Sequence, residues 1–155
     1  MQKTFLIIKP DAVARGLCGQ IISRLEQKGL TLVAAKMILL TDEILDKHYA
    51  HLADKPFFGG IKEFMKKTPV IVSVWEGVDA VNVVRNLCGV TNAREAAPGT
   101  IRGDFANSIQ ANVVHASDLQ ETAEKEVAMY FSREEIFDYA HCKKKTLYSK
   151  DELAQ

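Results

Sequence analysis

The stretch Asn112-Val113-Val114-His115-Ala116-Ser117-Asp118 joins a short apolar strand to the beginning of a helix. The apolar run predicts a strand over Asn112 to His115, and the helix that Ser117 and Asp118 lead is predicted to reach Phe131, with Asp118 and Glu121 spaced as a capping box. The first turn of a helix attracts anions, and imidazole is nucleophilic near neutral pH. This junction therefore predicts phosphate chemistry at His115, although a lone histidine after a strand is more often a packed or surface residue.

Further strands and helices are predicted on the N-terminal side of this junction. Apolar runs predict strands over 4–9, 30–40 and 70–75, and apolar spacing predicts helices over 18–28, 43–49, 57–66 and from Asp79 to Cys88. Thr41 or Asp42 is expected to cap the second of these helices, and Gly29 and Gly89 to end the first and the last. Helices are doubled between some strands, which favours an α+β fold of the ferredoxin-like, split βαβ kind, an antiparallel sheet covered by helices.

The segment from Thr91 to Asn107 has no clear period and contains Pro98, Gly99 and Gly103. It is predicted to be a long loop, and loops of this length in compact domains are usually functional or disordered.

Length and composition narrow the possible classes of protein. The 155 residues fit one domain over 1–155, with a short C-terminal tail from about 149. Lys plus Arg and Asp plus Glu both number 20, so charge does not predict binding to nucleic acid or to an anionic membrane. Cys18, Cys88 and Cys142 form no CxxC pair, and no apolar run suggests a signal peptide or a membrane span. We expect a cytoplasmic protein with reduced thiols.

Neither of the common glycine-rich phosphate motifs, GxxxxGK[ST] and GxGxxG, is present. Phosphate would instead be held by basic side chains, for which the candidates are Lys9, Lys55, Arg85 and Arg102. The run from Lys143 to Lys145 is interpreted as a solvated face. The remaining histidines, His48, His51 and His141, are interpreted as surface or partly packed residues.

Seven segments of the chain, in order, resemble the nucleoside diphosphate kinase family. They are Phe5-Leu6-Ile7-Ile8-Lys9-Pro10-Asp11, Pro56-Phe57-Phe58, Val74-Trp75-Glu76-Gly77, Gly89-Val90-Thr91-Asn92, Pro98-Gly99, Thr100-Ile101-Arg102-Gly103-Asp104-Phe105 and Asn112-Val113-Val114-His115. The resemblance covers nearly the whole chain. It implies that His115 takes the terminal phosphoryl group of a nucleoside triphosphate and passes it to a nucleoside diphosphate, in a ping-pong cycle through phosphohistidine.

The resemblance also implies roles for other residues. Those similar in position to the family's ribose and phosphate ligands are Lys9, Tyr49, Arg85, Thr91, Arg102 and Asn112. Phe57 resembles the platform on which the base stacks, and Ile109 an apolar residue on the other side of the base. Glu126 resembles the carboxylate that orients the histidine, and Ser117 a hydroxyl in the same network. Mg²⁺ is expected as the cofactor, bound mainly through the nucleotide phosphates rather than by protein ligands.

Four positions depart from the family pattern. Ala116 replaces a usual glycine, which would strain the backbone if φ is positive there. Leu119 replaces a serine, and Ala93 replaces a proline, which is expected to loosen the long loop and weaken any subunit contact that it makes. Lys55 replaces an arginine and keeps the charge without the two-pronged geometry.

Two other functions remain open at this point. One is a nucleotide-binding scaffold of the same fold with little or no turnover, for which Ala116 is the hint. The other is a phosphorelay carrier, which would leave Phe57 and the phosphate ligands without a role. The resemblance further implies a homo-oligomer, either a tetramer or a hexamer.

Overall fold

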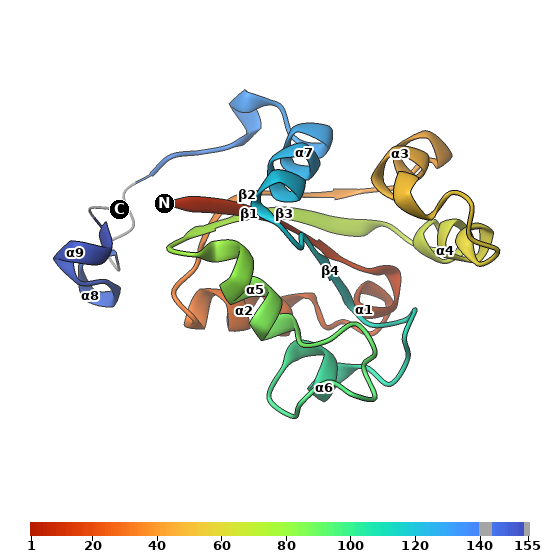
Figure 1. Ribbon diagram of the computed structural model, residues 1–155, viewed down its shortest axis with the longest axis horizontal. Coiled ribbons are helices and arrows are strands. Elements are labelled where there is room, and N and C mark those ends of the chain that lie inside the picture. Colours follow the sequence, from red (N-terminus) through yellow and green to blue (C-terminus); the bar gives the residue numbers. More distant parts are fainter. Residues whose placement is uncertain (140–143, 154–155) are drawn as a thin grey trace.

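A four-stranded antiparallel sheet forms the centre of the computed structural model, which describes residues 1–139 and 144–153. Its strands are β1 (Gln2–Ile8), β2 (Thr31–Ile38), β3 (Val70–Gly77) and β4 (Val114–Ala116), in the order β2-β3-β1-β4. β1 pairs with both β3 and β4, and the sheet runs through the middle of the molecule in Figure 1. The predicted α+β, ferredoxin-like fold is confirmed.

Nine helices are present in the described part of the chain. They are α1 (Pro10–Ala14), α2 (Cys18–Gln27), α3 (Asp42–His48), α4 (Phe58–Met65), α5 (Ala80–Cys88), α6 (Ile101–Phe105), α7 (Gln120–Tyr130), α8 (Lys144–Leu147) and α9 (Lys150–Leu153), with 3₁₀ turns at Ala50–Leu52 and Arg133–Glu135. None of the helices within residues 1–139 and 144–153 combines the length and the apolar character needed to cross a bilayer.

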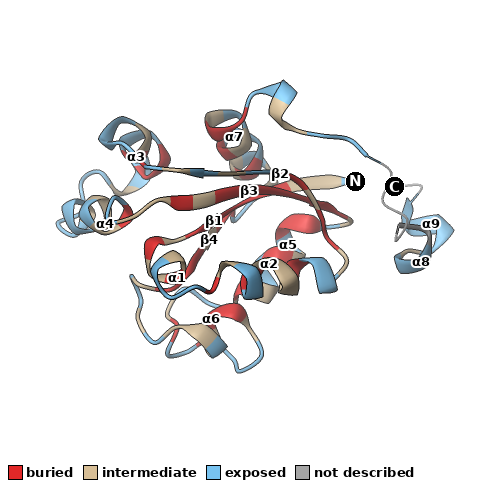
Figure 2. Cartoon of the chain, turned by 180° about the vertical axis from the view of Figure 1, so that it is seen from behind, coloured by how far each residue is buried: buried red, intermediate tan, exposed pale blue. Residues whose placement is uncertain are grey.

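Both faces of the sheet are covered, which explains why its strands are apolar at almost every position. In Figure 1, α2 and α5 lie on one side of the sheet and α7 on the other. Leu6 and Ile8 pack in the core on the α2 and α5 side, whereas Phe5 and Ile7 pack in the core with α7, because successive strand side chains point to opposite faces. Figure 2 shows β3 and β4 as largely buried, whereas part of β2 and the outer surfaces of the helices are exposed.

Among the helices within residues 1–139, the short helices α1 and α6 were not predicted. Pro10, which follows the predicted strand over 4–9, occupies the first turn of α1, where its fixed φ suits a helix and its missing N–H is no loss. The predicted loop over 91–107 contains α6, whose first turn is capped by the Thr100 hydroxyl accepting from the Gly103 N–H at 3.1 Å. Both helices are only five residues long, too short for apolar spacing to reveal.

The prediction for the beginning of α7 was wrong. The helix starts at Gln120 with Leu119 at the N-cap, and no side chain caps it, so Asp118 and Glu121 do not form a capping box. A capping box is formed instead by Ser132 and Glu135, at the next 3₁₀ turn. His115 consequently lies within β4, four residues before Leu119, rather than at the start of a helix.

The other caps were predicted with mixed success. Thr41 caps α3 by accepting from the Ile44 N–H, and Gly29, at φ +99°, follows the last turn of α2. Asp79 precedes α5, but its side chain accepts from Asn82 rather than from the backbone. The predictions for His141, Cys142 and the side chains of 143–145 lie outside the described residues.

The strained backbone lies at Val113, three residues before the position where strain was expected. Val113 has φ +63°, a conformation that is costly for a β-branched residue, whereas Ala116 pairs with Leu6 in the sheet and has no positive φ. Two hydrogen bonds hold Val113: its N–H donates to Asp11 Oδ2 at 3.1 Å, and its carbonyl accepts from the Lys9 N–H at 2.9 Å. Ala116 therefore introduces no strain of the expected kind.

Candidate active site

A cavity of about 940 Å³ extends from the end of the sheet at β4 to α3 and α4. Polar and basic side chains line its inner part, and apolar side chains from α4 and the segment before it line the rest. The lining residues with a predicted role are Lys9, Tyr49, Phe57, Arg85, Thr91, Arg102, Ile109, Asn112, His115 and Glu126. A cleft of this size and mixed lining is typical of a small-molecule site.

His115 is held rigidly at the base of this cavity. It lies in the middle of β4 directly opposite Ile7 of β1, and its flanking residues Val114 and Ala116 are buried. Its side chain is half-buried and lines the cavity. A side chain on a paired strand, even at the edge of a sheet, is positioned more precisely than one on a loop.

Glu126 and Ser117 fix the orientation of the His115 ring. Glu126 lies on the buried face of α7, and its Oε1 is 2.9 Å from His115 Nε2. The fully buried Ser117 hydroxyl donates to the other carboxylate oxygen, Oε2, at 2.5 Å. Burial by itself would raise the pKa of Glu126, but the hydrogen bond from His115, the two nearby imidazoles and Ser117 hold that pKa below its usual range. An ionised Glu126 keeps the proton of a neutral His115 on Nε2, which leaves the lone pair on Nδ1.

His48 lies beside this pair and was wrongly interpreted from the sequence as a surface or partly packed residue. Its side chain is only 1% exposed, its ring meets the His115 ring edge-on at 4.5 Å between centroids, and its Nε2 lies 3.5 Å from Glu126 Oε1. Burial, followed by the proximity of His115, lowers the pKa of His48 to about 3, so the contact with Glu126 is not an ion pair at neutral pH. A signal existed in the sequence, because His48 follows Leu45 by three residues and both are buried on one face of α3.

Lys9 and Asn112 connect two segments that are distant in the sequence. Lys9 Nζ donates to Asn112 Oδ1 at 2.6 Å, and Asn112 Nδ2 donates to the carbonyls of Thr91 and Ile109 at 2.8 and 3.0 Å. Burial and the nearby Arg102 lower the pKa of Lys9 to about 8. Lys9 is therefore a cation that needs an anionic partner, as expected of a phosphate ligand.

The two arginines of the cavity differ in their surroundings. Arg102 is buried, and its terminal nitrogens donate to the carbonyls of Gly89 at 2.6 Å and Val114 at 2.9 Å, while its Nε has no partner among the described residues. Arg85 is exposed on α5, and Thr91 is exposed at the beginning of the long segment. Arg102 is thus a fixed positive charge, whereas Arg85 and Thr91 are free to adjust to a ligand.

The outer part of the cavity presents apolar side chains to solvent. Phe57 is 54% exposed and Ile109 is 60% exposed, although both line the cavity. Large apolar side chains exposed at a concave site indicate a ligand with a flat apolar surface. Phe57 is therefore not part of the hydrophobic core.

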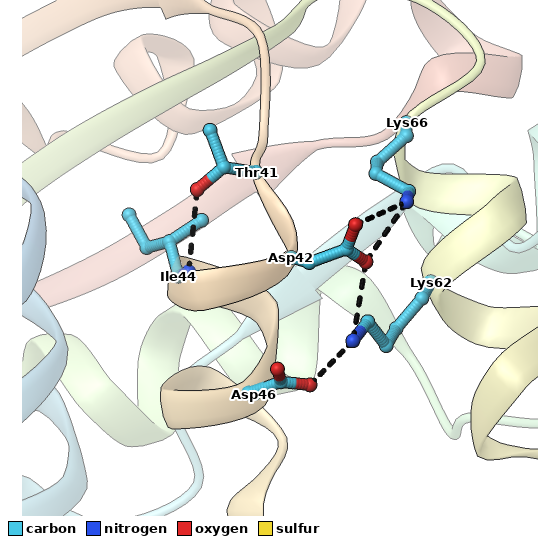
Figure 3. Close-up of polar contacts among 6 residues, drawn as sticks. All are labelled: Thr41, Asp42, Ile44, Asp46, Lys62 and Lys66. Carbon is cyan, nitrogen blue, oxygen red and sulfur yellow. Dashed lines mark hydrogen bonds and ion pairs between the residues drawn. The ribbon is translucent and has the colours of Figure 1, made fainter.

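Ion pairs join the two helices that form this outer wall. Figure 3 shows Lys62 of α4 between Asp42 and Asp46 of α3, at 3.1 and 2.6 Å, and Lys66 at 2.8 Å from Asp42. Hydrogen bonds from Lys66 and Lys62 lower the pKa of Asp42. Single surface ion pairs contribute little, but this connected set orients α3, which carries His48 at its end, relative to α4.

Nearly all of the predicted site residues therefore converge on one cavity. Ser117 lies behind it, in contact with Glu126, and Lys55 lies outside the lining. His51, which was not given a role, lines the cavity as an exposed residue. Asp118 was predicted only as a helix cap and Thr122 had no predicted role, yet both line the cavity, from the segment that leads into α7 and from its first turn.

A ferredoxin-like sheet with a carboxylate-oriented histidine, a group of cations and an apolar shelf in one cavity defines a nucleotide phosphotransferase. Comparison with known proteins agrees with this class of protein. The family model described as "Nucleoside diphosphate kinase" matches residues 2–136, and the chain belongs to that family, whose members transfer the terminal phosphoryl group of a nucleoside triphosphate to a nucleoside diphosphate.

Three relatives illustrate the similarity. A nucleoside diphosphate kinase of Parabacteroides distasonis is 58% identical over 153 residues, which are 99% of this chain and 100% of the relative. The structure of a halophilic nucleoside diphosphate kinase from Halobacterium salinarum in complex with CDP has a TM-score of 0.93 and 43% identity, and the match covers 96% of this chain and 99% of the other. A transition state mimic of the Borrelia burgdorferi enzyme with bound vanadate and ADP has a TM-score of 0.86 and 38% identity, covering 92% and 94%.

Proposed function

We propose that His115 carries the phosphoryl group between the two half-reactions. Its Nδ1 attacks the terminal phosphorus of a nucleoside triphosphate, an N–P bond forms as the bridging P–O bond breaks, and the nucleoside diphosphate leaves. A second diphosphate then attacks the phosphohistidine and restores the ring. The observation that carries this proposal is the 2.9 Å contact between Glu126 and His115 Nε2, since it assigns the lone pair to Nδ1.

The cations and polar groups of the inner cavity bind the phosphates and ribose in this proposal. Lys9, Arg85 and Arg102 neutralise phosphate charge, and Thr91, Asn112 and Tyr49 hold oxygen atoms by neutral hydrogen bonds. Their common position in the cavity lining supports the assignment. Burial raises the pKa of Tyr49, so it keeps its O–H as a donor. Phosphoryl transfer depends mainly on such positioning and charge neutralisation.

The base would stack on Phe57, with Ile109 on its other side. Every base has a π-face, so this arrangement binds purines and pyrimidines alike. The CDP and ADP bound to the two structural relatives are one pyrimidine and one purine nucleotide, which supports this role.

Mg²⁺ would enter with the nucleotide. Two carboxylates line the described cavity; Glu126 is already engaged by His115 and Ser117, and Asp118 is engaged by the Thr122 side chain. A site with so few free oxygen ligands fits a Mg²⁺ ion held chiefly by phosphates and water. When bound, the ion supplies charge neutralisation at the phosphates.

The test is the covalent intermediate itself. Protein incubated with Mg²⁺ and [γ-³²P]ATP should acquire a label that is lost in acid and stable in alkali, and the label should vanish in His115→Ala but persist in His51→Ala. Initial rates with several acceptor diphosphates should give parallel double-reciprocal lines. Stoichiometric nucleotide binding with no label in the unaltered protein would contradict the proposal and support a scaffold without turnover. The hint for that scaffold, strain at Ala116, is absent from the backbone.

We also propose that residues 1–155 act as one domain with a tail from about 149, in a homo-oligomer in the cytoplasm. Met37 and Leu39, near the end of the edge strand β2, are 57% and 66% exposed, and association would cover them. Light scattering distinguishes a monomer from a tetramer or hexamer.

A further inference from the structure

We propose that His48, His115 and Glu126 form an inhibitory binding site for Zn²⁺, distinct from the Mg²⁺ that accompanies the nucleotide. One ligand atom from each of the three residues lies within 4.8 Å of the other two. Two imidazoles and one carboxylate form a common ligand set for zinc, whereas Mg²⁺ prefers oxygen ligands alone.

The distances suit a tetrahedral ion. Ligands about 2.0–2.2 Å from Zn²⁺ in a tetrahedron lie roughly 3.4 Å apart. Glu126 Oε1 lies 2.9 Å from His115 Nε2 and 3.5 Å from His48 Nε2, so small side-chain movements would bring all three to bonding distance. The cavity lies on the open side of this group, which leaves room for water as a fourth ligand.

His48 gives an independent reason to expect a ligand. Its side chain is 1% exposed, yet neither ring nitrogen has a hydrogen-bond partner among the described residues. Buried polar atoms are usually satisfied, and the exceptions call for a physical account. A metal ion bound to one of these ring nitrogens would supply the missing partner.

The outer contacts of the group also match those of a metal site. Ser117 donates to Glu126 Oε2 and so turns Oε1 toward the two histidines. Metal-ligating carboxylates are commonly held in this way by a second hydrogen bond. The group is therefore already oriented without the ion.

Binding at this site would block catalysis through the ring proton. A coordinate bond from His115 Nε2 uses the lone pair of that nitrogen, so the one proton of the neutral ring moves to Nδ1 through solvent. The Nδ1 lone pair, which the proposed function assigns to attack on phosphorus, is then engaged in an N–H bond. The inhibitory effect rests on the proposed function, whereas the metal site itself does not.

Cobalt spectroscopy on the metal-free full-length protein tests the site directly. We expect Co²⁺ to give the intense visible bands of a tetrahedral ion, Zn²⁺ to abolish them, and both His48→Gln and Glu126→Gln to lose them. The control His51→Gln, an exposed histidine of the same cavity, should retain them. Circular dichroism confirms that each variant is folded. X-ray absorption of the zinc-loaded unaltered protein should show two imidazole ligands. A zinc ion with one imidazole ligand or none would overturn the proposal, and so would cobalt bands that persist in His48→Gln.

A second measurement tests the effect on catalysis. The rate of phosphohistidine formation should fall with Zn²⁺ at the same midpoint as the spectral displacement, and by on the order of 10⁴-fold at saturation, the cost of presenting the wrong tautomer of a catalytic histidine. In His48→Gln the rate, relative to the same variant without zinc, should be far less sensitive. Zinc binding without slower labelling would overturn the blocking mechanism. Absence of any label without zinc would instead contradict the proposed function, while leaving the cobalt result intact.

Discussion

Replacing Glu126 with glutamine tests how the site activates its histidine. The substitution preserves size but removes a negative charge 2.9 Å from His115 Nε2. The carboxylate has two accepting oxygens, and both are occupied, one by His115 and one by Ser117 at 2.5 Å. Glutamine has only one accepting oxygen, so one of these hydrogen bonds has to change.

The expected cost follows from the charge of the acceptor. Hydrogen bonds to a charged group contribute about 1.5–3 kcal/mol and neutral ones about 0.5–1.5 kcal/mol, so removing the charge costs about 1–1.5 kcal/mol in the resting enzyme. The ring gains positive charge as Nδ1 attacks, which raises the cost in the transition state. Loss of such orienting partners typically costs about 10- to 100-fold, and we expect phosphorylation of Glu126→Gln to slow by that factor.

Ser117→Ala provides the matched comparison. It keeps the Glu126 charge and deletes one hydrogen bond to that charge, with an expected cost of about 1.5–3 kcal/mol, or about 13- to 160-fold. Because Ser117 acts through Glu126, Ser117→Ala should have little further effect in the Glu126→Gln background.

Rapid-quench measurement of single-turnover labelling with [γ-³²P]ATP isolates the chemical step from product release. Thermal unfolding of each variant separates a local effect from a loss of structure. A rate for folded Glu126→Gln within twofold of the unaltered protein would refute the role assigned to this carboxylate. Fully additive effects of the two substitutions would refute the claim that Ser117 acts through it.

Three further predictions concern charge, stacking and strain. The pKa of Lys9 is lowered to about 8, so its positive charge is present below that pH and lost above it. We therefore expect kcat/KM to fall as the pH rises through about 8, and this fall should be absent in Lys9→Arg. A fall of equal size in Lys9→Arg would argue against Lys9 as its source. Phe57→Ala should weaken the binding of all nucleotides by a similar amount, about 1–3 kcal/mol in titration calorimetry. Phe137→Ala, an exposed aromatic residue outside the cavity, should leave nucleotide binding unchanged. Weaker binding of nucleotides with one base alone would contradict the stacking role. In chemical denaturation Val113→Gly should be more stable than Val113→Ala by about 1 kcal/mol, because φ at this position is +63°. At Val74, an ordinary strand position, the alanine variant should instead be more stable than the glycine variant. The same order of stability at both positions would mean that Val113 is not strained.

The fold was predicted from the helices doubled between strands, and the strands themselves could be recognised because they are apolar on both faces. A segment such as Phe5-Leu6-Ile7-Ile8 is apolar at every position, and only a sheet covered by helices on both sides buries all of it. The long helices α2, α4 and α5 were predicted within two residues, because each buries a regular apolar stripe. The short helices α1 and α6 carry no such stripe, so local spacing did not reveal them.

The sequence by itself determined the chemistry available at the site, since His115, Glu126 and the cations proposed to bind phosphate were identified from residue types, order and resemblance. Only the tertiary structure decided how these groups meet. The hydrogen bond between Lys9 and Asn112 spans 103 positions, and the positive φ of Val113 is held by contacts with α1 and the end of β1. His48 lies at the end of α3, and its buried ring is in contact with His115 of β4 and Glu126 of α7. Periodicity reports which face of an element is apolar, but not which distant side chain will lie against it. For that reason the histidine that completes the proposed zinc site was missed in the sequence and was found only in the fold.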